Sequence, residues 1–406
     1  MKDMSPRHNA IKNNNASASG RYPSIGKRGP TVMQVLPAME AGGAEQGCLD
    51  INAELVRAGS QSLVVCNGGF RLHEIARTGG QHIALPVDSK NPVTIARNVN
   101  RLRKLIRQWD VDIVHARSRA PAWSCYYACK KENVPFVTTC HAPYNISGAA
   151  KKAYNSVMAK GDRVIAISHY VADYLRRYYD IDESKMRVVY RGIPLEIYHP
   201  TSVTPERMIQ LSRQWRLPEE ASVVMLPGRL TRWKGQHVLI EAMSMVKNKN
   251  AFAVIIGSDQ GRKAYRKELE ELVEKYNLQD KLRMVDHCRD MPAAYMLSTA
   301  VVSASTDPEG FGRIPVEAQA MGRIAIGVDH GASKETVISG ETGWLIPPGN
   351  ATALAAAIDK SLAMPENERV KMATRAMAHV EEHFAREQMV NQTFAVYADI
   401  LQNHDT

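Results

Sequence analysis

The chain has 406 residues, a formal net charge of +10 and 44% hydrophobic residues. This length exceeds the usual size of one domain and favours two α/β domains of similar length. The apolar content is enough for two buried cores, but no run approaches the roughly 20 apolar residues of a spanning helix, so the sequence does not predict an integral membrane protein.

Residues 1–29 are polar, rich in Asn, Ser, Lys and Arg, and lack the apolar stretch of a signal peptide. The first 30 residues hold six Lys or Arg and one Asp, so this end is strongly basic. We predict a disordered basic tail on a protein that stays in the cytoplasm. No recognised nucleic-acid-binding module follows, which favours anionic lipid or a phosphate-bearing substrate over nucleic acid as a partner for the basic surface.

From residue 31 onward, short apolar runs alternate with amphipathic stretches, a pattern typical of βαβ units and parallel sheets. The two clearest helices are expected at 44–58 and 94–109. Strands are expected at 31–37, 61–66, 112–116, 135–139, 163–167 and 187–190. Together they predict a Rossmann-like domain over residues 30–205.

A polar stretch at 200–218 looks like the connection to a second domain. The next strands are expected at 222–227, 252–256, 282–285, 300–303 and 324–327. They predict a second Rossmann-like domain over residues 206–385, and the last helix, 386–406, is expected to pack back on the first domain. Because ligands bind at the carboxyl ends of parallel strands, the predicted fold is α/β, with two Rossmann-like domains facing each other across a cleft.

The second domain opens with a loop that carries two cations. Arg229 and Lys234 follow the strand at 222–227, and Gly235 precedes the next helix. Arg presents a planar fork of donors and Lys a compact point charge, and both suit a diphosphate. An exposed charged loop is the alternative interpretation of this segment alone.

A second segment, Ser305 to Ala318, follows the strand at 300–303. Glu309 lies in its loop, and Glu317 falls about one turn inside the following helix. Glycines beside Glu309 let the backbone approach a ligand closely, and free amides at the helix start can bind sugar hydroxyls or an anion. Carboxylates suit vicinal hydroxyls, so this segment predicts a sugar site.

These residues resemble the retaining glycosyltransferases of family four, the glycosyl transferases group 1, which have the GT-B fold. The resemblance covers roughly residues 31–385. Within the family, the chain resembles the bacterial enzymes of cell-envelope and lipopolysaccharide synthesis. The resemblance rests on Glu309-Gly-Phe-Gly with Glu317, Gly228-Arg-Leu with Lys234-Gly, the segments 326–337 and 343–349, and Gly42-Gly-Ala-Glu45.

The resemblance implies a role for each matching position. Arg229 and Lys234 would bind the donor diphosphate, Glu317 would hold the ribose, and Gly43 would present its amide to the phosphates. Histidine is frequent near the transferred sugar in this family, which makes His141 a further candidate. Glu309 would contact hydroxyls of the donor sugar together with the backbone amides of Gly310, Phe311 and Gly312.

The resemblance also implies the reaction, which is transfer of a hexose from a UDP-, GDP- or ADP-sugar to a glycan or glycolipid hydroxyl. The family needs no metal, and the sequence offers neither zinc-like Cys spacing nor an Asp-x-Asp pair at a strand end. Alternatives on the same fold are a glycoside phosphorylase, a sugar-nucleotide epimerase or an inactive sugar-nucleotide-binding protein.

Three further segments are candidates for contacts with the acceptor, with a membrane and with the nucleotide base of the donor. His115, Arg117 and Arg119 follow a strand and could meet an acidic acceptor, or form an ordinary basic loop. The loop 287–291 is expected near the nucleotide base. Lys151, Lys152, Tyr154 and Lys160 suit either anionic headgroups at the inner membrane surface or a solvated helical face.

Overall fold

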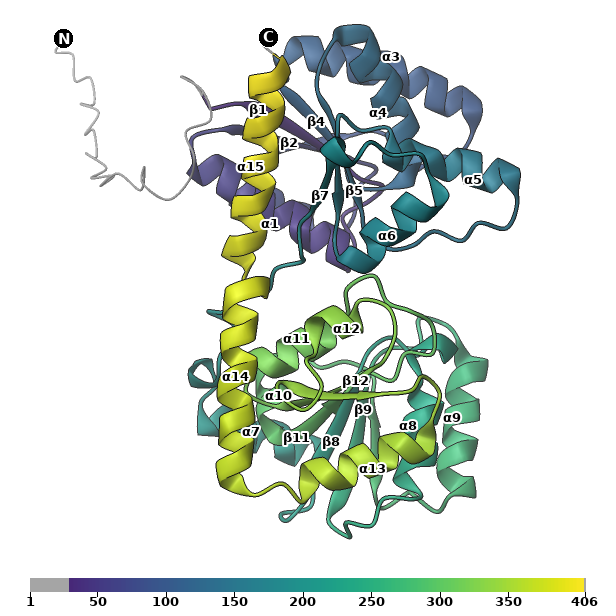
Figure 1. Ribbon diagram of the computed structural model, residues 1–406, viewed down its shortest axis with the longest axis vertical. Coiled ribbons are helices and arrows are strands. Elements are labelled where there is room, and N and C mark those ends of the chain that lie inside the picture. The colour runs from purple at the N-terminus through teal and green to yellow at the C-terminus, as the bar shows by residue number, and fades with distance from the viewer. Residues whose placement is uncertain (1–28, 405–406) are drawn as a thin grey trace, which may run out of the picture.

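The computed structural model describes residues 29–404, so the predicted tail, 1–29, lies outside the described residues except for Gly29. Two α/β domains are stacked end to end (Figure 1). The strands of the first are β1 (Thr31–Val35), β2 (Gln61–Cys66), β3 (Gln81–Ala84), β4 (Ile113–Ala116), β5 (Phe136–Cys140), β6 (Arg163–Ala166) and β7 (Met186–Val188). Its helices are α1 (Gly43–Arg57), α2 (Leu72–Arg77), α3 (Pro92–Gln108), α4 (Arg119–Glu132), α5 (Ala149–Asn155) and α6 (His169–Tyr178).

The second domain repeats the same alternation of strands and helices. Its strands are β8 (Ser222–Pro227), β9 (Ala251–Ile256), β10 (Leu282–Val285), β11 (Ser298–Val302), β12 (Ile324–Val328) and β13 (Gly343–Ile346). Its helices are α7 (Pro205–Trp215), α8 (Gln236–Met243), α9 (Lys263–Lys275), α10 (Met291–Leu297), α11 (Arg313–Ala320), α12 (Ser333–Thr336), α13 (Ala351–Leu362) and α14 (Glu366–Phe384), and α15 (Arg386–His404) ends the chain.

Both sheets are parallel throughout, with the orders β3-β2-β1-β4-β5-β6-β7 and β10-β9-β8-β11-β12-β13. The prediction of two Rossmann-like domains is therefore confirmed. Strand order reverses beside β1 in one sheet and beside β8 in the other. Ligands bind in the crevice at such switch points, so the loops after β1, β4, β8 and β11 frame the expected site.

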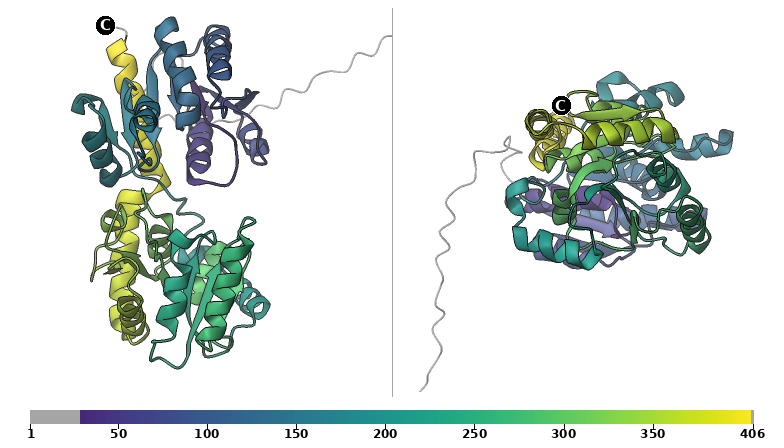
Figure 2. Two further views of the ribbon diagram at one scale, coloured as in Figure 1. Left: turned by 90° about the vertical axis from the view of Figure 1, so that its right-hand side faces the viewer. Right: turned by 90° about the horizontal axis from the view of Figure 1, so that it is seen from below.

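Side chains of the central strands alternate between the two faces of each sheet, because successive residues of a strand point to opposite sides. In β1, Val32 belongs to the core shared with α1 and α15, while Met33 belongs to the core shared with α3 and α4. In β8, Val224 faces α8 and α13, whereas Val223 faces α7 and α10. Figure 2 shows the resulting layers, with helices on both faces of each sheet.

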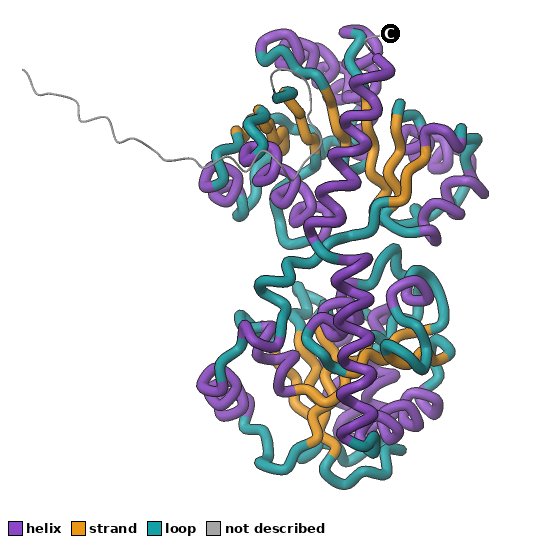
Figure 3. Tube along the Cα trace, turned by 60° about the vertical axis from the view of Figure 1, so that its left-hand side comes forward, coloured by secondary structure: helices purple, strands orange, loops and turns teal. Residues whose placement is uncertain are grey.

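The last helix belongs to the first domain. After α14 covers the second domain, α15 lies against the first, so the two helices run end to end along the molecule (Figure 3). Phe394 and Tyr397 are fully buried among strand residues of β1, β4, β5 and β6. The Tyr397 hydroxyl lies 2.7 Å from Nδ1 of His115, and Asp399 pairs with Arg163 at 2.7 Å.

The chain passes between the domains twice, and the two crossings are joined. The amide of Ile193 donates to the Phe384 carbonyl, and the amide of Arg386 donates to the Ile193 carbonyl, both at 2.9 Å. A Cβ on Gly192 would lie 2.5 Å from Cα of Arg386, so glycine is needed for this close approach. The crossings therefore behave as one connected segment.

We predict that Phe394→Ala lowers the free energy of unfolding of the first domain by about 3–5 kcal/mol, because it leaves a cavity in the core beneath α15. Chemical denaturation measures the change. Gln402→Ala, at an exposed position of the same helix, is the control and should shift stability by less than about 0.5 kcal/mol. Equal stability of both variants would contradict the docking of α15.

Candidate functional site

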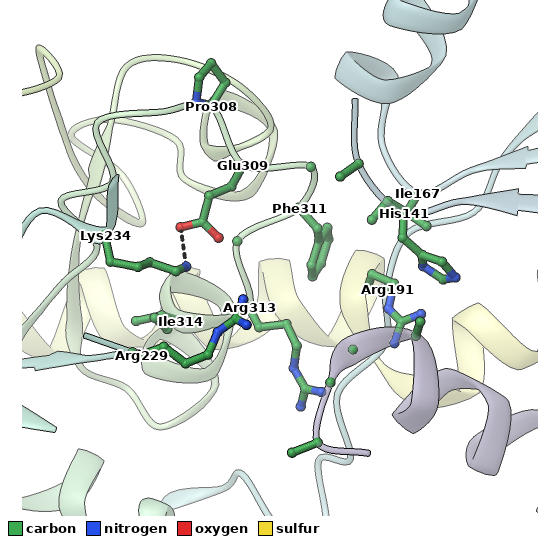
Figure 4. A pocket seen from close by; sticks show the side chains of 18 of the residues that line it. His141, Ile167, Arg191, Arg229, Lys234, Pro308, Glu309, Phe311, Arg313 and Ile314 are labelled. Carbon is green, nitrogen blue, oxygen red and sulfur yellow. Dashed lines mark hydrogen bonds and ion pairs between the residues drawn. The ribbon is translucent and has the colours of Figure 1, made fainter. Parts of the chain in front are cut away.

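A pocket of about 640 Å³ lies between the two domains, at the carboxyl ends of their strands. Loops from both sheets form it, as the strand orders require. It is lined by 41–45, His141, Ala142, Ile167, Arg191, Gly228, Arg229, Trp233, Lys234 and 308–314. The predicted residues His141, Arg229, Lys234, Glu309, Gly310, Phe311, Gly312 and Gly43 therefore share one cavity (Figure 4).

The loop after β8 is shaped by two glycines with positive φ. Gly228 has φ +148° and Gly235 has φ +73°, where side chains other than glycine are strained. A Cβ on Gly235 would also clash with the Ala304 carbonyl. The Gln236 side chain donates to the Arg229 carbonyl at 2.9 Å, which fixes the loop with both cations on the pocket wall.

Lys234 and Glu309 form an ion pair across the pocket wall. The Lys234 ammonium donates to Glu309 Oε1 at 2.8 Å, and both side chains are 12% exposed. The Ser305 hydroxyl donates to the same oxygen. These contacts hold Glu309 in one orientation with its second oxygen, Oε2, at the pocket.

The segment Glu309–Gly312 also forms part of the domain interface. A Cβ on Gly310 would lie 2.7 Å from the His141 carbonyl oxygen and 3.0 Å from Cα of Ala142. The Ser168 hydroxyl of the first domain donates to the Gly310 carbonyl at 2.7 Å. The Phe311 ring packs against Tyr190 and Phe384, with ring centroids 6.3 and 5.6 Å away. The Phe311 side chain therefore joins the domains, and the residue also lines the pocket.

The opposite wall begins with the N-terminus of α1. Its N-cap residue, Gly42, has no side chain that could cap the helix. The first amides of a helix also have no intrahelical acceptor. Gly43 lines the pocket. The amide groups of this turn and the helix dipole both favour a negative ligand here.

His141 follows β5 and is half-buried beside this wall. Its Nε2 atom has no hydrogen-bond partner among the described residues. Burial, reinforced by the Arg191 and Arg117 guanidinium groups, holds the pKa of His141 well below its usual value. The lowered pKa favours the neutral ring, and Nε2 is a buried nitrogen without a partner.

Two arginines of the pocket were given no role in the sequence analysis. Arg191 follows β7 and is 4% exposed, and burial together with Arg313 and Arg117 lowers its pKa to about 9. Arg313 opens α11 and pairs with Glu317 at 2.9 Å. Arg313 lies within the segment 305–318 and Arg191 directly follows the strand expected at 187–190, but their convergence on one cavity depends on packing between domains.

Glu317 does not line the pocket. The Tyr295 hydroxyl donates to its Oε2 at 2.7 Å and Arg313 donates to its Oε1. The carboxylate lies behind Arg313, where it orients that guanidinium. Its predicted contact with a ribose stays a prediction.

The hypothesis that His115, Arg117 and Arg119 face the cleft is wrong. His115 is fully buried on β4, between Tyr397 and Thr139, because its side chain points toward α15. Arg117 donates to the Gln34 side chain at 2.7 Å. Arg119 donates to the Asn155 side chain at 2.8 Å and lies over the ring of Tyr144.

The loop expected near the base borders a different cavity. His287, Cys288 and Asp290 line a pocket of about 410 Å³ together with residues of α7. The polar stretch around α7 was expected as a connection, but Leu211 and Trp215 are buried in the core of the second domain. That loop therefore lies outside the cavity shared by the two domains.

Comparison with known proteins gives a consistent result for both halves. Residues 41–197 match the family model "Glycosyltransferase Family 4", and residues 208–379 match "Glycosyl transferases group 1". The crystal structure of a glycosyltransferase from Rickettsia africae ESF-5 is 34% identical, covers 92% of this chain and 99% of that one, and superposes with a TM-score of 0.87.

Two more distant relatives carry more specific names. A D-inositol 3-phosphate glycosyltransferase of Streptomyces bingchenggensis is 24% identical over 313 residues, which are 72% of this chain and 68% of that protein. The Anabaena protein HepE, solved in complex with UDP and glucose, is 21% identical, covers 91% of this chain and 100% of that one, and has a TM-score of 0.80.

We predict that Gly310→Ala separates the two domains, because the added methyl group would meet backbone atoms of His141 and Ala142 at 2.7 and 3.0 Å. Small-angle X-ray scattering should report a larger radius of gyration than for the unchanged chain. Gly43→Ala is the matched control, since its methyl group would lie 3.6 Å from Arg191 in ordinary contact. Identical scattering from both variants would contradict the tight interface at Gly310.

Proposed function

This chain belongs to the group 1 glycosyltransferases, and we propose that it moves a hexose from a nucleoside-diphosphate sugar to a hydroxyl of a glycan or glycolipid, with retained anomeric configuration. The observation that carries the proposal is the shared cavity. Arg229 and Lys234 lie on one wall, Glu309 and a glycine-rich helix start lie beside them, and the N-terminus of α1 lies opposite.

In this proposal, Arg229 and Lys234 bind the diphosphate. Cleavage of the bond between the anomeric carbon and the phosphate oxygen leaves an electron pair, and so negative charge, on the diphosphate. Cations fixed at the position where charge develops stabilise that transition state. A donor that reaches Lys234 also shares the ammonium with Glu309, whose carboxylate then accepts hydrogen bonds from sugar hydroxyls.

The proposed retention of configuration requires the acceptor and the leaving phosphate to use the same face of the anomeric carbon. The acceptor oxygen attacks the anomeric carbon from the face that the phosphate leaves and gives its proton to a phosphate oxygen. Glu309 is engaged by an ammonium and a serine hydroxyl, which lowers its reactivity as a nucleophile and supports direct attack over a double displacement. Arg229 and Lys234 beside the donor supply positive charge, which supports transfer without a metal.

The role in lipopolysaccharide or envelope polysaccharide synthesis is also part of the proposal, with the protein acting at the cytoplasmic face of an anionic membrane. Among residues 29–404, no helix has the length and hydropathy to span a bilayer. Lys151, Lys152 and Lys160 are exposed on and after α5, and this supports a peripheral contact through headgroup charge.

We predict that Arg229→Ala and Lys234→Ala each cost about 3 kcal/mol of transition-state stabilisation, or a factor of about 10²–10³ in rate, by analogy with losing one oxyanion-hole donor. A panel of UDP-, GDP- and ADP-sugars, with a chelator present, identifies the donor by thermal shift and slow hydrolysis. Arg232→Ala is the matched control, because Arg232 lies on the same loop, is 65% exposed and pairs with Glu268.

Turnover near that of the unchanged chain in the Arg229 or Lys234 variant would contradict the diphosphate assignment. No thermal shift with any donor at millimolar concentration would contradict the proposed donor class.

For the membrane contact, we predict binding to vesicles that contain anionic lipid at low salt and its loss as salt is added, because charge attraction is screened over a Debye length. Co-sedimentation measures it. A chain with Lys151 and Lys152 changed to Gln should bind less than the unchanged chain. No binding at low salt would rule out this part of the proposal.

A further inference from the structure

The pocket wall opposite Arg229 and Lys234 contains a buried cation that forms no ion pair with any residue the structure describes. Arg191 is 4% exposed and lines the cavity. Among residues 29–404, no side-chain hydrogen bond or ion pair engages its guanidinium. A buried guanidinium in this state is energetically unfavourable unless an anion compensates it.

Two carboxylates of α1, those of Asp50 and Glu45, act on the charge of Arg191 without direct contact. Asp50, one helical turn along α1, accepts a hydrogen bond from the Gln46 side chain at 2.9 Å. Glu45 lies over Gly42 at the start of α1, where a Cβ on Gly42 would clash with its carboxylate, and the helix dipole favours a negative side chain there. Neither forms an ion pair with Arg191.

Close packing fixes the guanidinium of Arg191 in this position. A Cβ on Gly47 would lie 2.6 Å from Nη1 of Arg191, so the side chain fills the space that glycine leaves on α1. The nearest cations come from two other elements, Arg117 after β4 and Arg313 on α11. A pair of guanidinium groups that converge on one cavity is a geometry suited to phosphate or carboxylate.

We propose that Arg191, assisted by Arg313, forms a second anion subsite that takes a phosphate or carboxylate group of the acceptor. The inference rests on the proposed function, because it assigns the acceptor side of the same transfer reaction. The proposed site for an acidic acceptor is therefore Arg191, and not His115, Arg117 and Arg119, whose side chains have partners inside the first domain.

The donor diphosphate is the other source of such an anion, and the geometry favours the acceptor. Figure 4 shows Arg191 beside His141, on the far side of Phe311 from Arg229 and Lys234. A diphosphate on Arg229 and Lys234 is proposed to meet the first domain at the Gly43 amide, which leaves the Arg191 guanidinium beside His141 for the second substrate. The D-inositol 3-phosphate glycosyltransferase among the relatives is named for an acceptor that carries phosphate, which agrees with this subsite.

The test uses inorganic phosphate as the probe. It is titrated by calorimetry into the full chain, saturated with whichever of UDP, GDP and ADP stabilises it. We expect phosphate to bind this loaded chain, and Arg191→Gln to weaken that binding about tenfold or more, as for a lost charged hydrogen bond, with unchanged affinity for the nucleotide. Arg229→Ala should weaken nucleotide binding and, once enough nucleotide is present to saturate this variant, leave phosphate binding unchanged.

Matched variants separate charge, geometry and folding. Arg97→Gln removes an exposed cation from the same domain and should bind phosphate like the unchanged chain. Arg191→Lys keeps the charge without the planar fork and should bind phosphate more weakly than Arg191 does. The midpoint temperature of thermal unfolding, measured without phosphate, should be as high for Arg191→Gln as for the unchanged chain. The reason is that the substitution removes a buried charge that has no ion-pair partner among residues 29–404.

Competition between phosphate and the nucleotide, or unchanged phosphate binding in Arg191→Gln, would overturn the subsite. Failure of every nucleoside diphosphate to bind would instead contradict the proposed function. In that case, phosphate binding by the unloaded chain that Arg191→Gln removes would still support the anion subsite.

Discussion

The candidate site depends on two complete sheets being held with their carboxyl ends face to face. Neither domain forms the pocket alone, since Gly43, His141 and Arg191 come from one, and the two cations and Glu309 from the other. Three contacts fix the position of one pocket wall relative to the other. They are the close approach at Gly310, the aromatic cluster around Phe311, and the hydrogen-bonded crossings at Ile193 and Phe384. A residue that enlarges this interface by one methyl group therefore changes the distance between all the groups that are proposed to meet the two substrates.

Charge organises the pocket in a second way. Lys234 is paired with Glu309 and Arg313 with Glu317, so these side chains are oriented before any ligand arrives. Preorganised charges need little rearrangement during a reaction, which is why they are effective catalysts. Arg191 differs because its guanidinium is buried without a partner among the described residues. The pairs on the second domain suit the donor, and the unpaired cation on the first is left for an anionic group of the acceptor.

Much of the fold and part of the site could be predicted from the sequence, because apolar runs mark buried strands and glycine-rich motifs mark the loops after them. The edge strands β3 and β13 were not recognised as strands, since both are short and partly exposed. The error at His115 has a specific cause. Which face of β4 points inward depends on α15, and the partner Tyr397 lies 282 residues away. Arg191 was missed for the same reason, because its burial depends on Gly47 and on the opposite domain.

We propose that a single nucleotide-sugar contacts both domains in one pocket. Hydrogen–deuterium exchange on the full chain, with and without the donor that the sugar-nucleotide panel identifies, tests it directly. We expect slower exchange at 228–236 and 309–314 in the second domain, and at 42–46 in the first, at the same donor concentration. Protection confined to the cavity between α7 and the loop 287–291, with 42–46 and 309–314 unchanged, would contradict it.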